Sequence, residues 1–198
     1  SGEEVSFQGK YYQFDDVDIH PSPSSPGSIP IWYCGNSPAS VRRAVEYCRG
    51  WMPGRITLRT FVKRVERMQM LAEQHGKPLP TRAVIPITSP GRTREQALAK
   101  VNWQGILAGA AKAGWVTPAS GGWTGPDDLE GAVIAGDPNH IVEETVKYHE
   151  AGLQHLVYDF RFRFDDWYDC IALIGEEVLP KLRAMERGAG APAAAAAG

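Results

Sequence analysis

The hydrophobic pattern from residue 30 onward predicts a buried strand, a tight turn and a helix. Ile31–Cys34 is a short apolar and aromatic run that the chain enters through Pro30. Gly35 permits a sharp turn, because glycine reaches positive φ without steric cost. Asn36 or Ser37 can cap a helix that runs from about residue 39 to 49, with a proline in its first turn. We expect the other elements to be arranged around this strand–turn–helix unit.

Further apolar runs predict three more strands and four more helices. Residues 60–75 carry apolar side chains at helical spacing: Phe61, Val65, Met68 and Leu71. The solvent-facing side of this helix is expected to carry Lys63, Arg64, Glu66 and Arg67. Residues 139–150 and 165–183 also read as helices, the latter with Ile171, Ile174, Val178 and Leu182 inward, and a shorter helix starts at Thr93. The strands are residues 50–54, 82–88 and 153–160, whose continuous apolar character suits a parallel sheet covered by helices.

Three stretches fall outside this alternation. Residues 1–30 form an approach segment, with a small hairpin at Val5–Tyr12 turning at Gln8-Gly9 and a proline-rich run that must be extended or looped. Residues 103–123 are rich in Gly and Ala and predict an irregular helical excursion with a mobile loop, either a binding loop or a connector without a role. The Ala/Gly-rich residues 186–198 predict a disordered tail. The domain itself is then 31–185.

Strict alternation of strands and helices implies an α/β fold with parallel strands and right-handed crossovers. An open doubly wound sheet and a (β/α)8 TIM barrel both fit this order. A barrel takes about 250 residues, and four strands cannot close one. A barrel-derived chain of this length would therefore be about half a barrel, with two exposed sheet edges that need a partner or the other half.

Composition narrows the class of protein. The 198 residues are 43% hydrophobic and 22% charged, as in ordinary soluble globular domains. A net charge of -2 leaves no basic footprint for nucleic acid, and no apolar run reaches the roughly 18 residues of a membrane span. Three scattered cysteines suggest a reducing, cytoplasmic setting. The chain begins without Met, so processing, a tag or a longer parent protein all fit.

Few metal or acid–base candidates emerge from spacing. Asp15, Asp16 and Asp18 resemble a metal cluster, but no His or Glu stands at ligand spacing, and we expect a solvated loop and no metal. The turn at residues 35–40 is different. The amino end of the following helix carries free N–H groups and a positive dipole end, with the Ser37 and Ser40 hydroxyls beside it, so it forms a ready anion site. The alternative is an ordinary strand-to-helix junction with a capped helix end, which explains the same residues without a bound anion.

A family resemblance sharpens this choice. Pro30-Ile-Trp-Tyr-Cys-Gly-Asn-Ser-Pro-Ala-Ser-Val-Arg-Arg-Ala followed by Gly50-Trp-Met-Pro resembles the luciferase-like monooxygenase superfamily. The earlier Phe7-Gln-Gly-Lys-Tyr-Tyr-Gln-Phe and the later Gly136-Asp-Pro to Tyr158-Asp-Phe segments resemble it in the family's order. The resemblance implies a (β/α)8 barrel of which this chain holds strands five to eight. It also implies redox chemistry with FMN or F420, and Arg42-Arg43 favours the F420 branch.

The resemblance assigns roles to single residues. Gly35, Asn36, Ser37 and Ser40 match the family's phosphate-binding turn, whereas Cys34 departs from the glycine that relatives carry there. Trp51 is expected near the cofactor at the active-site mouth. The ends of the later strands should share that mouth, because barrel sites lie at the carboxyl ends of the strands; these residues are Ile87, Thr88, Asp159 and Arg161.

The sequence leaves two alternative roles for a pair of arginines near the end of the last strand. Arg161 and Arg163 could meet an acidic substrate or cofactor tail, or form a solvated pair near Asp165 and Asp166. His155 is expected to be structural. We expect an oxidoreductase acting on a small organic substrate by hydride transfer or oxygen-dependent oxidation, with the chain either self-associating or joining the missing half-barrel. The alternative is a non-catalytic half-barrel that serves as a subunit or relic.

Overall fold

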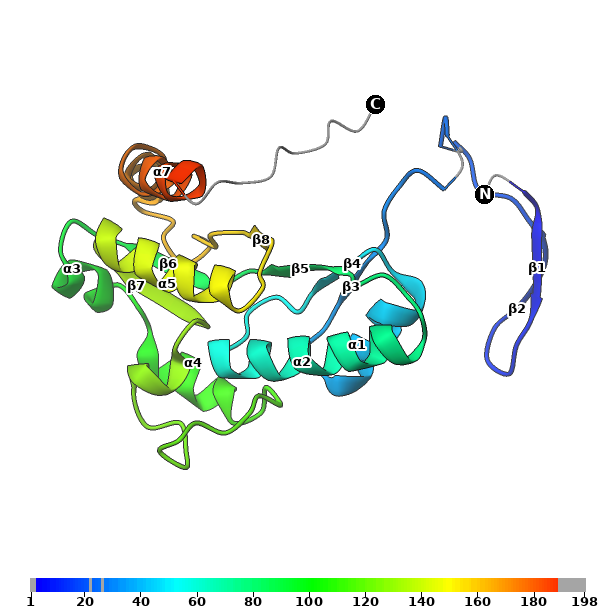
Figure 1. Cartoon of the computed structure of the whole chain (residues 1–198), viewed down its shortest axis with the longest axis horizontal. Helices are drawn as coiled ribbons and strands as arrows, with labels where there is room; N and C mark the ends of the chain where they lie inside the picture. The colour runs from blue at the N-terminus through cyan, green and yellow to red at the C-terminus, as the bar shows by residue number, and fades with distance from the viewer. Residues whose placement is uncertain (1–2, 22, 26, 189–198) are drawn as a thin grey trace.

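A computed structural model of the chain describes residues 3–21, 23–25 and 27–188 (Figure 1). Its strands are β1 (Val5–Gln8), β2 (Gln13–Val17), β3 (Trp32–Cys34), β4 (Gly50–Met52), β5 (Thr81–Val84), β6 (Ile87–Pro90), β7 (Val133–Gly136) and β8 (His155–Leu156). Its helices are α1 (Pro38–Tyr47), α2 (Leu58–Gln74), α3 (Arg94–Ala99), α4 (Trp103–Ala110), α5 (Pro138–Glu150), α6 (Trp167–Leu173) and α7 (Leu179–Gly188). A 3-10 turn (Pro126–Leu129) precedes β7, and a π-helical segment (Ile174–Val178) joins α6 to α7.

The strands after residue 30 are all parallel, as the alternation predicts. One sheet has the order β3-β4-β5-β8, and β6 pairs with β7 in a second sheet. A parallel bridge between Ile87 and Asp159 links the two sheets. Within the described residues the sheets stay open and close no barrel.

The run predicted as one strand at residues 82–88 is in fact two strands. Pro86 lacks an N–H group, so the ladder cannot continue through it. Before the proline, β5 pairs with β4 and β8; after it, the N–H of Ile87 donates to Ala132 O (3.1 Å) and β6 pairs with β7. The strand β7 itself was missed by the sequence analysis, because its four apolar residues directly precede the Asp137 cap of the next helix.

The last predicted strand is also shorter than expected. Only His155–Leu156 pairs regularly, although residues 153–160 were expected to be extended. Beyond it, single hydrogen bonds hold the chain beside the sheet: Val157 N donates to Val84 O (3.0 Å) and Asp159 N donates to Pro86 O (3.2 Å). The end of this segment therefore lies just past the carboxyl end of β5, beside the first residues of β6.

The amino-terminal hairpin forms, with its turn displaced from the predicted place. β1 and β2 are antiparallel, and Gly9 N donates to Tyr12 O (2.9 Å), so the turn lies at residues 9–12. In Figure 1 the hairpin stands at one end of the molecule, away from the other elements. Asp15 and Asp16 lie on β2 and accept hydrogen bonds from Gln8 and Ser6, so the expected solvated loop is wrong there.

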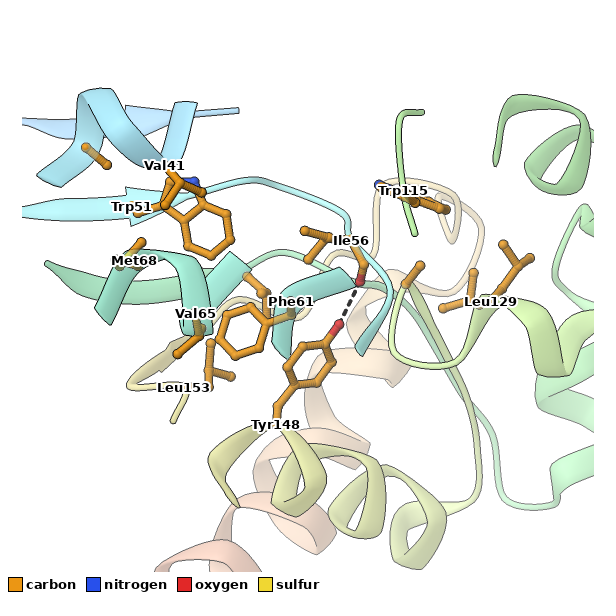
Figure 2. Close-up of a cluster of buried hydrophobic side chains, with 14 of the residues drawn as sticks. Val41, Trp51, Ile56, Phe61, Val65, Met68, Trp115, Leu129, Tyr148 and Leu153 are labelled. Carbon is orange, nitrogen blue, oxygen red and sulfur yellow. Dashed lines mark hydrogen bonds between the residues drawn. The ribbon is translucent and has the colours of Figure 1, made fainter. Parts of the chain in front are cut away.

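The main core fills the space between the β3-β4-β5-β8 sheet and helices α1, α2 and α5 (Figure 2). Helix α2 buries the predicted face, with Phe61 stacked on Trp51 (ring centroids 5.9 Å). Tyr148 of α5 packs edge-on against Phe61 and donates a hydrogen bond to Ile56 O (2.6 Å). These contacts tie the segment after β4 to two helices.

A second, smaller core lies under the last helical run. Ile174 and Val178 are buried against Ile134 and Ile141, as predicted, but Ile171 is exposed and its inward assignment is wrong. The π-helical segment adds a residue to the turn, so the buried position before it is Cys170 instead of Ile171. Helix α7 runs through Gly188, into the expected tail of residues 186–198; residues 189–198 lie outside the described part.

Candidate functional site

The turn after β3 requires a glycine. Gly35 has φ 142, a region that side-chain-bearing residues rarely adopt. A Cβ atom there would lie 2.6 Å from Ser40 Oγ and 3.2 Å from Ser40 Cβ. The turn therefore brings its backbone close to the first turn of α1, and this close approach is possible only without a side chain.

Ser37 is the N-cap of α1, which decides between the two predicted caps. Its side chain accepts a hydrogen bond from Ser40 N (3.1 Å), and Pro38 occupies the first turn as expected. The hydroxyls of Ser37 and Ser40 are 2.8 Å apart and bond to each other, and Ser40 is buried. Ser37 is therefore the more accessible hydroxyl at this helix end.

Asn36 connects the turn to a distant loop. Its Nδ2 donates to Ala113 O (3.1 Å), which follows α4. Arg64 of α2 makes the same connection from the other side, with Nε donating to Asn36 O (2.9 Å) and an Nη to Gly114 O (3.4 Å). Burial lowers the pKa of the Arg64 guanidinium, and the Arg67 charge adds to this effect.

Arg64 is therefore a site residue that the sequence analysis missed. It was assigned to the wet side of its helix from periodicity alone. The one available signal was an arginine three residues after the buried Phe61, and helical spacing cannot show that the turn of residues 35–36 lies within its reach. The structure places a cationic side chain against the backbone of the predicted phosphate turn.

Trp51 lies under the turn rather than at an open mouth, and its expected place near the cofactor stays a prediction. Its side chain is 0% exposed, because α1 and α2 cover this face of β4. The indole Nε1 donates to Gly35 O (2.8 Å). Trp51 thus supports the turn from the core side and fixes the Gly35 carbonyl.

The remaining strand-end residues have structural partners. Ile87 and Thr88 are buried, and Thr88 Oγ1 donates to Pro86 O (3.1 Å). Asp159 is paired with the exposed Arg161 (2.7 Å). Cys34 is exposed with a free thiol at the end of β3. The structure brings Ile87, Thr88 and Asp159 together at the start of β6, just past the carboxyl end of β5.

His155 lies on the edge strand β8. It is the first residue of this two-residue strand, pairs with Ala83 of β5, and is exposed. Its ring packs at 75° against Trp32, with centroids 5.9 Å apart. The ring contact with Trp32 is consistent with the expected structural role.

Arg163 is buried and has several hydrogen-bond partners, so the alternative of a solvated pair near Asp165 and Asp166 is wrong for this residue. It holds Asp166 through Nε (2.8 Å) and Nη2 (2.7 Å), and Nη1 donates to Ser89 Oγ and Pro90 O (both 2.8 Å). The hydrogen bond from Arg163 lowers the pKa of Asp166, although burial opposes this. The arrangement clamps the segment after β8 to the end of β6.

The predicted excursion at residues 103–123 contains a regular helix and an organised loop. α4 is capped by Asn102, whose side chain accepts from Gly105 N (3.0 Å). Asp128 then gathers the loop by accepting from Ser120 Oγ (2.5 Å), Thr124 N (2.7 Å) and Gly125 N (3.0 Å). These hydrogen bonds, led by that from Ser120, lower the Asp128 pKa to about 2.

Replacing Asp128 with Ala is expected to loosen this loop without unfolding the protein. Because the carboxylate's folded pKa is depressed, its contribution is present above the unfolded value of 3.8 and is lost as pH falls through about 2. Hydrogen exchange at pH 5 should show faster exchange of the Thr124 and Gly125 amides in the variant. Asp127→Ala, at the exposed neighbour, is the control; equal protection in both variants would contradict the assignment.

The described residues hold no group of three or more His, Cys, Asp or Glu side chains that could bind a metal ion. Likewise, none of the described helices has the length and apolarity to cross a membrane.

What the site offers chemically is a glycine turn, a serine-capped helix end and a guanidinium behind them. This combination suits an anionic group.

Comparisons with known proteins place this geometry in context. The chain is 28% identical to an F420-dependent glucose-6-phosphate dehydrogenase of Nakamurella multipartita and 25% identical to one of Amycolatopsis mediterranei. Both alignments cover 93% of this chain, but 57% and 58% of the relatives. The chain therefore spans a little over half the length of these relatives.

Solved structures share the fold. The F420-dependent tetrahydromethanopterin reductase of Methanopyrus kandleri superimposes with a TM-score of 0.66 and 19% identity, covering 91% of this chain and 58% of that one. The oxygenating constituent of 3,6-diketocamphane monooxygenase of Pseudomonas putida, in complex with FMN, gives 0.63 and 19%, with coverage of 91% and 59%. The sequence profile of luciferase-like monooxygenases matches residues 1–155. The chain therefore belongs to the luciferase-like monooxygenase family.

Proposed function

We propose that this chain is part of an oxidoreductase that uses F420 or FMN and binds the cofactor phosphate at the turn of residues 35–40. The observation that carries the proposal is Gly35, whose positive φ and contact with Ser40 leave no room for a side chain. Membership of the family and the F420-dependent relatives support the same reading. The reaction would be hydride transfer or oxygen-dependent oxidation of a small organic substrate.

The residues present fit a phosphate. The amino end of α1 presents backbone N–H groups and the positive end of the helix dipole. Ser37 adds a hydroxyl, and Arg64 adds a positive charge behind the Asn36 carbonyl. Trp51 holds the Gly35 carbonyl to the core, which keeps the turn in one conformation. The bound F420 or FMN would supply the redox chemistry.

We also propose that residues 31–185 are part of a (β/α)8 barrel. The helices cover one face of the β3-β4-β5-β8 sheet, and the opposite face carries Trp32, Met52 and Val157. Trp32 lies over Gly50, where a Cβ atom would overlap its ring. Glycine at this position lets the large ring lie flat on the neighbouring strand.

A contact across the sheet also supports the barrel. Trp32 and His155 lie on the two edge strands, yet their rings are 5.9 Å apart. Three strand spacings of about 4.8 Å separate the backbones of such strands by about 14 Å in a flat sheet. The Trp32 ring spans part of this separation by lying over Gly50 of β4, and the two rings meet over the face opposite the helices of the described residues. The rest of a barrel, or a second copy of the chain, would cover it, in a reducing cytoplasmic setting that suits the free cysteines.

A cofactor titration of the whole natural protein tests the function. Fluorescence of FMN and of F420 is followed as protein is added, and saturable binding of one of them is expected. A well-folded protein that binds neither would exclude the oxidoreductase reading and favour the alternative, a non-catalytic half-barrel.

Removing both hydroxyls tests the place of binding. Ser37→Ala with Ser40→Ala is expected to weaken cofactor affinity while the protein stays folded, because the cap contributes only about 1 kcal/mol of helix stability. The same titration measures the affinity, and circular dichroism checks the fold. Ser24→Ala with Ser25→Ala, in the exposed approach segment, is the matched control. An unchanged affinity would show that the turn is only structural.

A further inference from the structure

A cavity of about 450 Å³ opens beside the first residues of β6. Its walls come from β6, from the start of α4 with the residues just before it, and from the segment after β8. Three cationic side chains line it: Arg55, Lys100 and Arg163. No aspartate or glutamate of the described residues lies in its wall. The cavity is therefore positively charged.

The three cations differ in how far they are neutralised. Arg163 and Lys100 share one carboxylate, Asp166, at 2.7 and 3.4 Å. Asp159 acts on Arg55 electrostatically but is itself paired with Arg161 at 2.7 Å. Among the three cations, Arg55 thus lacks a dedicated counter-charge. The other two, Arg163 and Lys100, share the single carboxylate of Asp166, so positive charge is in excess in the wall.

Arg55 also carries a buried donor without an acceptor. Its Nε is shielded from solvent and has no hydrogen-bond partner among the described residues. Buried N–H groups are nearly always paired, so an unpaired one calls for a partner. Burial lowers the pKa of Arg55 and the Arg161 charge lowers it further, while Asp159 opposes both.

The guanidinium is held in place from several sides. Its central carbon lies 6.0 Å over the ring of Trp115, and Gly54 before it has φ 77. The next residue, Ile56, is fully buried and accepts a hydrogen bond from Tyr148 through its carbonyl (2.6 Å), as Figure 2 shows. Arg55 is thus preorganised rather than free to fold back on a neighbouring carboxylate.

We propose that this cavity binds a small organic anion, with its carboxylate or phosphate group on Arg55 and Lys100. The remainder of the molecule would lie on the apolar part of the wall, formed by Ile87, Val101, Ile106 and Phe162. A guanidinium binds carboxylate and phosphate oxygens through charge-assisted hydrogen bonds. The amino end of α4, capped by Asn102, adds its positive dipole end to the same wall.

The cavity and the phosphate turn lie at the same end of two neighbouring strands. Arg55, in the cavity wall, follows the carboxyl end of β4, and Gly35 follows the carboxyl end of the adjacent parallel strand β3. Its use as a substrate pocket rests on the proposed function, whereas anion binding itself requires no cofactor. The two ideas can therefore fail separately.

Calorimetric titration of the whole, cofactor-free protein tests the binding. The probes are benzoate and phenyl phosphate, with neutral benzamide as the comparison ligand. Saturable binding of at least one anion and none of benzamide is expected. Binding of benzoate alone or of phenyl phosphate alone would support the proposal and identify the group; binding of neither anion would overturn it.

Variants locate the site. Arg55→Met is expected to weaken anion affinity by about tenfold or more, since charged hydrogen bonds are the stronger ones. Arg59→Met, an exposed arginine on α2, removes the same charge outside the cavity and should change the affinity little. Equal weakening in both variants would overturn the assignment. If Arg55→Met does not fold, Lys100→Met decides by the same criterion.

Competition connects the cavity to the proposed function. Anion binding that persists in protein saturated with F420 or FMN supports a substrate pocket. Displacement of benzoate by the cofactor would assign the cavity to the cofactor and overturn the substrate role. Failure of the cofactor titration would leave the anion result and the effect of Arg55→Met unaffected.

Discussion

Trp51→Ala is expected to lower the free energy of unfolding by about 3–5 kcal/mol. Trp51 is completely buried, stacks on Phe61 and lies in the largest core cluster. Truncation to Ala leaves a cavity between the sheet and helices α1 and α2, and it also removes the hydrogen bond to the Gly35 carbonyl. Urea unfolding followed by circular dichroism measures the loss.

Two further variants separate the contributions. Trp51→Phe keeps an aromatic ring against Phe61 but removes the indole N–H, and it should have a smaller effect than Ala, including about 1 kcal/mol for the hydrogen bond. Trp167→Ala at a half-exposed tryptophan should change stability by about 0.5 kcal/mol. Equal losses for Trp51→Ala and Trp167→Ala would show that Trp51 is not the core residue described here.

Gly35→Ala is expected to abolish or strongly weaken binding of F420 or FMN. The added Cβ would lie 2.6 Å from Ser40 Oγ, and alanine would be strained at φ 142, which costs about 1–3 kcal/mol. The turn can relieve this strain only by moving away from the helix end, which displaces the proposed phosphate contacts. The fluorescence titration measures the affinity, and thermal unfolding measures the accompanying destabilisation.

The matched control is Gly175→Ala. Gly175 lies in the last helical run, and a Cβ atom there meets nothing within 4 Å. This variant should bind the cofactor as the natural protein does and be at least as stable, because alanine favours helix over glycine. Full cofactor affinity in Gly35→Ala would contradict the phosphate turn, even if the protein were destabilised.

Local signals in the sequence carried most of the secondary structure. The Gly35 turn, the Pro38 first turn and the amphipathic face of α2 all depend on residues within one or two turns of each other. Errors occurred where a boundary depends on a distant partner. β5 and β6 separate at Pro86 because the chain changes from the β4 and β8 ladders to the β7 ladder, and β7 begins 47 residues after that proline.

The candidate site divides in the same way. Gly35, Ser37 and Ser40 could be predicted because cap and turn chemistry follows from adjacent residues. The role of Asn36 could not, because its partner Ala113 is 77 residues away. No signal in the sequence pointed to Arg55. A buried donor can be recognised as unpaired only when the positions of all the surrounding atoms are known.

The sequence by itself determined the alternation of strands and helices, the glycine turn and the family, because these are written in short-range periodicity and local motifs. Only the tertiary structure decided that Trp51 supports the turn from the core, that Arg64 backs it, and that Arg163 is a buried clamp. The physical reason is that burial and pairing depend on long-range packing. In particular, the glycine turn is held by Arg64 of α2 and by Ala113 after α4, which lie 28 and 77 residues beyond Asn36.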